Sequence, residues 1–333
     1  MNIIYPLLLA FVLTSCTDNS QTTPRHVEMP VPLEIKQITA TDSLKIPDMR
    51  NVIQWKLLSD SRIAIYDYGQ TNALVGVYKL PKLDHIYTYG KQGRGPNELV
   101  SAMWADVNDP NQISLYDVMS KKQYIMEATD TNINVLAQYP LALMHDVPLA
   151  KPYQTIQQTS AGNFLYYAQM RPPNGTLLEV RNPRKNTLSD SLNTVLDTEM
   201  HDAYILTRPI RNEVFVAFSG LNRIELFDIN DSGKMIPYLT IGDILIENQN
   251  IEHCSYIDIQ TDGEFIYALN NNFAADIESA KTTLEKWNMK GELLIVYTLD
   301  RYIDKILPNP VAGNIYGHSP LGEKESIFIY ELD

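Results

Sequence analysis

Residues 89–127 read YGKQGRGPNELVSAMWADVNDPNQISLYDVMSKKQYIME. A glycine-rich loop is followed by an apolar segment at 103–107, and two strand patterns come next, at 113–117 and 123–127. Polar turns separate these segments. Strands of four to eight residues divided by turn residues at this spacing are typical of antiparallel β-structure. The stretch therefore predicts an all-β fold, and it defines a unit that can be sought elsewhere in the chain.

The unit repeats about every 50 residues. The strongest strand of each repeat begins at Ile63, Ile113, Phe164, Val214, Phe265 and Ile315, which gives intervals of 50, 51, 50, 51 and 50. Each of these strands precedes a partner with apolar and polar residues in alternation, and further strand patterns flank each pair. Repeats of about 40 to 50 residues with four strands each are typical of propeller blades. The sequence predicts a six-bladed β-propeller of four-stranded antiparallel blades.

The sixth repeat ends at Asp333, directly after its third strand. Segment 33–39, LEIKQIT, alternates apolar and polar residues and has no blade of its own. Pairing it with the last blade would cover two open strand edges. We therefore expect a ring closed by residues 33–39 and one propeller domain over 33–333. A pair of β-sandwiches is the alternative, and the uniform spacing across the midpoint favours the propeller.

The N-terminus has the pattern of a lipoprotein signal. Residues 3–13 form an apolar run too short to span a bilayer, and the sequence Leu-Thr-Ser-Cys at 13–16 resembles a bacterial lipobox. The n-region carries no Lys or Arg. We expect a signal peptide at 1–15, lipidation of Cys16, and a flexible tether at 16–32 that is rich in polar residues and proline. Membrane contact is then through the N-terminal lipid.

The net charge and the cysteine content limit which partners and which disulfide bonds can be expected. The net charge is −13 and no basic run occurs, so a nucleic-acid partner is not expected. Cys254 is the only cysteine besides Cys16, so no internal disulfide is expected once Cys16 carries lipid.

A family resemblance rests on short motifs and on the repeat. Gly-x-Gly-Pro-x-Glu occupies 93–98, and Tyr-Asp ends two of the repeated strands, at Asp67 and Asp117. Six such units behind a lipobox resemble the six-bladed propeller lipoproteins of Bacteroidetes, a group similar to TolB-type and NHL-repeat propellers. The resemblance covers about 33–333, and blades three to six lack the glycine-proline signature. It implies an extracytoplasmic binding or scaffolding domain and no catalytic residues.

Motifs for catalysis and cofactors are incomplete. The loop at 90–95 lacks the Gly-Lys-Ser/Thr and helix of a phosphate-binding loop. Segment 228–233 resembles half of a calcium loop, but Leu239 stands where a bidentate Glu is required. Neither Gly-x-Ser-x-Gly nor His-Glu-x-x-His occurs. The sequence predicts no catalytic residue, no metal and no cofactor, and it favours a binding protein over an enzyme.

One face of the predicted ring carries the longer loops. Connections at 90–102, 140–152, 242–253 and 270–282 share it, whereas the opposite turns at 59–62, 261–264 and 288–291 are short. Extra loop length suggests a binding surface. Four histidines, three neighbouring carboxylates and one arginine lie on this long-loop face and are predicted to bind a ligand: His145, Asp146, His201, Asp202, Glu252, His253, His318 and Arg94. A ring of His and carboxylate around a divalent ion, or simply solvated loop residues, are the alternatives.

These expectations define a function hypothesis. The chain is expected to be a monomeric, lipid-anchored binding or protein-interaction scaffold of the cell envelope, on the outer membrane and facing the periplasm or the exterior. A protein or small ligand would bind the long-loop face. The alternative is a propeller-type metal-dependent hydrolase or lactonase with its site at the mouth of the central channel.

Overall fold

The computed structural model describes residues 24–45, 52–58, 61–67, 73–95, 98–140, 155–159, 161–169, 176–182, 184–185, 187–194, 203–207, 212–218, 223–242, 255–272, 281–321 and 326–332. Every regular element in these ranges is a β-strand. Within them, no helix is long and apolar enough to cross a membrane.

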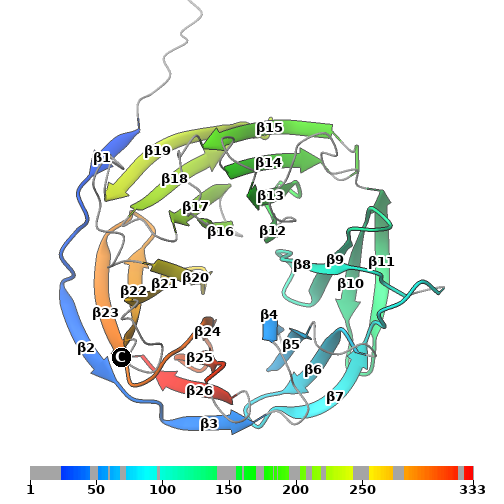
Figure 1. Ribbon diagram of the computed structural model, residues 1–333, viewed down its shortest axis with the longest axis horizontal. Coiled ribbons are helices and arrows are strands. Elements are labelled where there is room, and N and C mark those ends of the chain that lie inside the picture. The colour runs from blue at the N-terminus through cyan, green and yellow to red at the C-terminus, as the bar shows by residue number, and fades with distance from the viewer. Residues whose placement is uncertain are drawn as a thin grey trace, which may run out of the picture.

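Six sheets form a ring of blades (Figure 1). Blade 1 is β4 (Val52–Leu58), β5 (Arg62–Asp67), β6 (Val75–Lys79) and β7 (Asp84–Tyr89). Blade 2 is β8 (Ala102–Ala105), β9 (Gln112–Asp117), β10 (Lys122–Ala128) and β11 (Ile133–Pro140). Blade 3 is β12 (Thr155–Gln158), β13 (Phe164–Gln169), β14 (Thr176–Asn182) and β15 (Thr187–Thr194). The first strand of each blade lies nearest the centre of the ring.

The other three blades follow the same plan. Blade 4 contains β16 (Ala203–Thr207), β17 (Glu213–Phe218), β18 (Arg223–Ile229) and β19 (Met235–Gly242). Blade 5 contains β20 (Ser255–Thr261), β21 (Phe265–Asn272), β22 (Lys281–Asn288) and β23 (Leu293–Leu299). Blade 6 contains β24 (Lys305–Asn309), β25 (Asn314–Ser319) and β26 (Ser326–Glu331). The predicted six-bladed all-β propeller is confirmed.

The N-terminal segment wraps around the outside of three blades. β1 (Arg25–Val27) pairs in parallel with β19, β2 (Glu34–Ile38) pairs in parallel with β23, and β3 (Asp42–Lys45) pairs antiparallel with β26. The expectation that residues 33–39 close the ring is therefore wrong: β3 completes blade 6, and β2 extends blade 5. Residues 25–27 were expected in the tether and form β1 instead. The alternation in 33–39 predicts a strand at an open edge but does not say which edge, and Ile38 packs against the core between blades 5 and 6.

The repeated strands were the easiest to detect because they are buried on both faces. Each is the second strand of its blade and lies between the two neighbouring blades, so its side chains meet protein on either side. All six residues of β5 and of β17 are buried. Outer strands alternate instead, and in β11 most residues are exposed. Burial on both faces requires an apolar run, which gives the 50-residue signal its strength.

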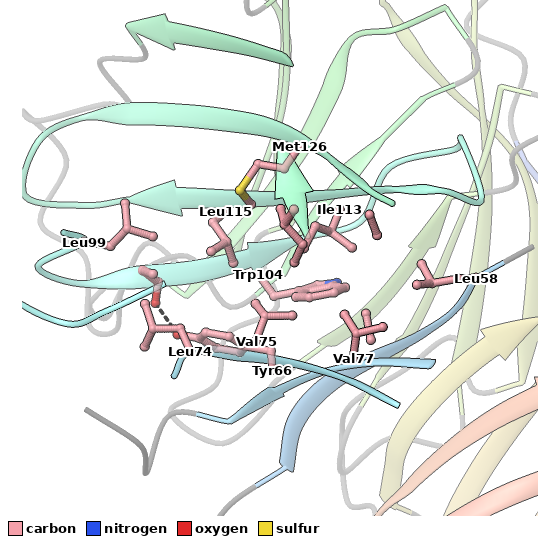
Figure 2. Packing of buried hydrophobic residues seen from close by; sticks show 14 residues of the cluster. Leu58, Tyr66, Leu74, Val75, Val77, Leu99, Trp104, Ile113, Leu115 and Met126 are labelled. Atoms are coloured by element: carbon pink, nitrogen blue, oxygen red, sulfur yellow. Dashed lines mark hydrogen bonds between the residues drawn. The ribbon is translucent and has the colours of Figure 1, made fainter. Parts of the chain in front are cut away.

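Figure 2 shows the apolar core between blades 1 and 2. The indole of Trp104 lies between Val75 and Val77 of blade 1 and Leu115 of blade 2. The hydroxyl of Tyr66 donates to the carbonyl oxygen of Ala102 (2.6 Å), which joins the two blades beside this core. This blade junction is closed by apolar contact, as close packing of a protein interior requires.

Candidate functional site

Most of the predicted ligand-binding residues lie outside the described residues. These are His145, Asp146, His201, Asp202, Glu252 and His253, and the predicted lipidation site Cys16 is also outside. The structure places Arg94 and His318. Their ligand-binding role, like that of the other six, stays a prediction.

Arg94 is exposed in the loop after β7, whose shape depends on the Gly-x-Gly-Pro-x-Glu motif. The carboxylate of Glu98 accepts a hydrogen bond from the Gly95 backbone N–H (2.7 Å) and forms an ion pair with Lys91 (3.4 Å). A methyl group on Gly93 would lie 2.0 Å from Glu98 Oε2, and one on Gly95 would lie 2.9 Å away. The N–H of Gly95 and the charge of Lys91 lower the pKa of Glu98. The motif therefore folds its own loop and presents Arg94 to solvent.

His318 occupies the seam between blades 6 and 1. Its side chain is buried, with 1% of the residue exposed, and Nδ1 donates to Asp304 Oδ1 (2.6 Å). Its ring meets Trp55 of blade 1 edge-on, with centroids 6.4 Å apart, and the Trp55 indole N–H donates to the carbonyl oxygen of Ile306 (2.9 Å). The imidazole is thus packed where the ring closes. Its Nε2 has no hydrogen-bond partner within the described part of the chain.

The inner strands are joined by polar ties that hold neighbouring blades together. Lys56 of blade 1 donates to the carbonyl oxygens of Val107 (2.6 Å), Asp109 (2.5 Å) and Gln112 (2.8 Å) of blade 2. Burial lowers the pKa of Lys56 to about 8, against the opposing charges of Asp106 and Asp109. The ammonium group fixes the turn between β8 and β9, and with it the position of Gln112.

The same turn is also tied to blade 3. The side-chain amide of Asn108 donates to the carbonyl oxygen of Thr159 (2.9 Å), and the Asn108 backbone N–H donates to Gln158 Oε1 (3.1 Å). Blades 5 and 6 use a carboxylate instead: Asp258 Oδ2 accepts from the backbone N–H of Ile306 (2.8 Å). Burial raises the pKa of Asp258 to about 6. These buried groups have structural partners, so their shifted pKa values alone do not mark a catalytic site.

Blades 2 and 3 enclose an open cleft of about 410 Å³. It lies on the side of the short turns, opposite to the long-loop face. Its residues come from both blades and from the two short turns of blade 3: Gln112, Ile125, Leu136, Ala137, Tyr139, Gln158, Ala161, Gly162, Phe164, Asn182 and Arg184. Small-molecule sites typically measure about 300 to 1,000 Å³ and combine apolar walls with a few polar groups. The cleft meets both criteria.

A repeated bulge shows why the cleft is open. In each of the first five blades the fourth strand has a β-bulge opposite the third strand. One fourth-strand residue in each of these blades is paired just before the bulge. From blade 1 to blade 5 this residue is Tyr87, Ala137, Asp190, Leu239 and Ile295. Ala137 is the smallest of the five.

At the junctions between blades 1 and 2 and between blades 4 and 5, this position lies against a turn of the next blade. The hydroxyl of Tyr87 donates to the carbonyl oxygen of Thr129 (2.6 Å), and Arg62 donates to the same oxygen. A methyl group on Gly291 would lie 2.9 Å from Leu239 Cδ2, and the cavity beside Gly291 between blades 4 and 5 measures about 10 Å³. Between blades 2 and 3, Gln112 stands at the strand position of Arg62 and Ala137 at that of Tyr87. Gln112 is shorter than Arg62 and Ala137 is shorter than Tyr87, and the space that they leave open is the cleft.

The junction between blades 2 and 3 also contains a buried ion pair. In blade 3 the third-strand residue paired just after the bulge is Arg181. The same position in blades 1, 2, 4 and 5 holds a large apolar or aromatic residue, namely Tyr78, Met126, Phe227 and Trp287. Arg181 Nε lies 2.8 Å from Glu179 Oε2, and both side chains are buried. Among the residues that the structure describes, six buried apolar residues form the core here, against fourteen between blades 1 and 2.

The described residues offer no obvious cation site. No group of three or more His, Cys, Asp or Glu side chains that could hold a metal ion occurs among them. The cleft itself contains no carboxylate and no histidine among its lining residues.

Sequence reasoning missed the cleft because it searched for long loops and titratable groups. The available signal was a comparison of equivalent positions across the repeats, in which Ala137 interrupts a series of larger side chains. Reading that signal requires the register of the outer strands, including the bulge, and the register is visible only in the folded chain.

No protein-family model matches the chain, and no curated protein matches it. The fold is similar to that of a candidate exported protein from Bacteroides fragilis, with a TM-score of 0.56 at 11% identity over 93% of this chain and 100% of the other. It is also similar to a member of a family of unknown function from Bacteroides vulgatus, with a TM-score of 0.58 at 8% identity over 89% and 98%. The β-propeller domain of Cps50 (Swd1) from Myceliophthora thermophila gives 0.53 at 12% identity over 88% and 99%. At these identities the likeness shows a shared propeller fold.

Proposed function

We propose that this chain is an exported, lipid-anchored binding protein whose ligand occupies the cleft between blades 2 and 3. The observation that carries the proposal is the cleft itself, because its volume of about 410 Å³ and its mixture of apolar and polar lining residues suit a small molecule. The ties on either side of it, through Lys56 and Asn108, support a preformed site on a rigid ring. The proposed family is that of the Bacteroidetes propeller lipoproteins.

The proposed location rests on the N-terminal sequence and on the fold. The pattern at 13–16 supports lipidation of Cys16, and one of the proteins with a similar fold is described as a candidate exported protein. The anchored domain faces the periplasm or the exterior. Cys16→Ser should release the protein from the membrane fraction, as followed by cell fractionation and immunoblotting. A variant that stays in the membrane fraction as fully as the wild type would contradict the anchor.

The long-loop face is proposed as a second surface, for a protein partner. Arg94 is exposed on it, in a loop shaped by Glu98. Apart from the buried His318, the other candidate residues belong to the long connections that the sequence predicts for this face. The alternative of a metal-dependent hydrolase or lactonase has no specific observation in its favour in the described ranges, where no three-ligand group occurs.

The binding role can be tested without knowing the ligand. Wild-type protein and the cleft-filling variant Ala137→Leu are purified from the same membranes, extracted with methanol, and compared by mass spectrometry. We expect a small molecule that accompanies the wild type and is depleted at least tenfold from the variant. Ala312→Leu, the same change at an exposed residue of the turn between β24 and β25 in blade 6, serves as the control and should retain the molecule. Identical extracts from wild type and Ala137→Leu would contradict the proposal.

A further inference from the structure

We infer that the cleft between blades 2 and 3 binds a small amphipathic anion, that is, an apolar molecule carrying one carboxylate or sulfonate group. The inference rests on the proposed function and adds the chemical class of the ligand. Two features of the lining carry it, the apolar walls and a single cationic side chain.

The walls of the cleft are apolar on both blades. Ile125, Leu136 and Ala137 come from the outer half of blade 2, and Phe164 comes from β13 of blade 3. Leu136 is 52% exposed although it is large and apolar. Covering such surface with an apolar ligand releases its hydration water and is favourable. An aromatic or aliphatic body is therefore the part of the ligand that meets these walls.

Arg184 is the only charged residue among the described residues that line the cleft. It lies in the turn between β14 and β15, is exposed, and has no ion pair within the part of the chain that the structure describes. Lys185 follows it directly, and no carboxylate occurs among the lining residues that the structure describes. A guanidinium group binds carboxylate and sulfonate oxygens through paired N–H donors.

The position of this cation is defined by its turn. The side chain of Asn182 accepts a hydrogen bond from the backbone N–H of Lys185 (3.0 Å), which closes the turn around Arg184. Asn182, Gln112 and Gln158 add neutral amide groups to the lining. The net charge of −13 is spread over the chain and is screened beyond about 8 Å at physiological ionic strength, so the local charge decides which ligand enters.

A pair of fluorescent probes separates the two features. 8-Anilino-1-naphthalenesulfonate has an apolar body and one anionic group, and N-phenyl-1-naphthylamine has the same body without the charge. We expect both to bind the full chain at one site, and the anion to bind more tightly. Arg184→Gln should weaken the anion about tenfold, the loss expected for one charge-assisted hydrogen bond, and leave the neutral probe within twofold. The matched control Lys185→Gln removes the same charge next to the cleft and should change neither probe by more than about twofold.

Two cleft-filling variants identify the site. Ala137→Leu fills the cleft from blade 2, and Ala161→Trp covers it from an exposed turn of blade 3, so that at least one can be tested in a folded protein. Both should reduce the affinity of both probes at least tenfold. If neither does, the cleft is not a binding site and the proposed function fails. If they do but Arg184→Gln affects the two probes equally or not at all, the cleft binds ligands and the inference of an anion is overturned.

Discussion

The junction between blades 1 and 2 and the junction between blades 2 and 3 are built from equivalent strands in equivalent register. The first is closed and the second is open. In the first, Tyr87 and Arg62 reach the turn of the next blade, and Trp104 fills the core between the sheets. In the second, Ala137 and Gln112 occupy the corresponding strand positions, and a cleft of about 410 Å³ remains. Two shorter side chains at one junction are therefore enough to open a cleft in a propeller while the strand framework stays the same.

The largest effect is expected from the closed junction. Trp104→Ala should destabilise the protein by about 4 kcal/mol, because it removes a large buried side chain and the indole N–H that donates to Asp106 (2.6 Å). Phe164→Ala, in the wall of the cleft, should cost less, about 2 to 3 kcal/mol, since solvent from the cleft can fill the space. Urea denaturation measures both. A greater loss for Phe164→Ala would contradict the contrast between the junctions.

The next effect concerns the turn that supports the cleft. Lys56→Met should destabilise the protein by about 3 kcal/mol, because three carbonyl oxygens lose their shared donor. It should also weaken binding of the neutral probe, since Gln112 then loses its fixed position. Lys79→Met changes an exposed lysine of β6 and should alter the free energy of unfolding by less than about 0.5 kcal/mol. Equal effects of the two changes would show that the Lys56 tie has no structural role.

The junction between blades 5 and 6 extends the comparison, because the hydrogen bond that joins these blades is accepted by an ionisable carboxylate, that of Asp258. The pKa of Asp258, about 6, lies above the value near 3.9 expected in the unfolded chain. Between about pH 4 and pH 6 the folded state therefore binds more protons than the unfolded state, and this carboxyl makes stability fall as pH rises. Asp258→Asn should remove roughly 1.5 to 2 kcal/mol of that decline, measured as the change in free energy of unfolding between pH 4.5 and 6.5. Wild type and variant with the same pH dependence would contradict the assignment.

The smallest expected effect is a gain in stability. Ala137→Leu should stabilise the protein by about 1 kcal/mol, because the added methylene groups cover Leu136 and Phe164 in a space that is already empty. The same change at Ala105, which is fully buried in the core of this junction, should destabilise by about 1 to 3 kcal/mol through overpacking. If Ala137→Leu costs as much as Ala105→Leu, then position 137 is not open.

The sequence predicted the ring because six strands buried on both faces must be apolar throughout, and their spacing is visible without a structure. It misplaced the closing strand, since the alternation in 33–39 fits the edge of blade 5 as well as that of blade 6. It did not reveal the cleft, because the decisive feature is a small side chain, Ala137, whose equivalence to Tyr87 and Leu239 depends on a bulge in each outer strand. A single small residue does not form a recognisable sequence motif.

The account depends most directly on whether position 137 is reachable from solvent while its equivalent at a closed junction is not. In a Cys16→Ser, Cys254→Ser background, Ala137→Cys and Leu239→Cys can each be labelled with the neutral reagent 4,4′-dithiodipyridine. Cys at 137 should react at the rate of an exposed thiol. Cys at 239, where the native leucine is 7% exposed, should react roughly a hundredfold more slowly, because it requires a local opening that costs about 3 kcal/mol. Equal labelling rates at the two positions would contradict an open junction between blades 2 and 3.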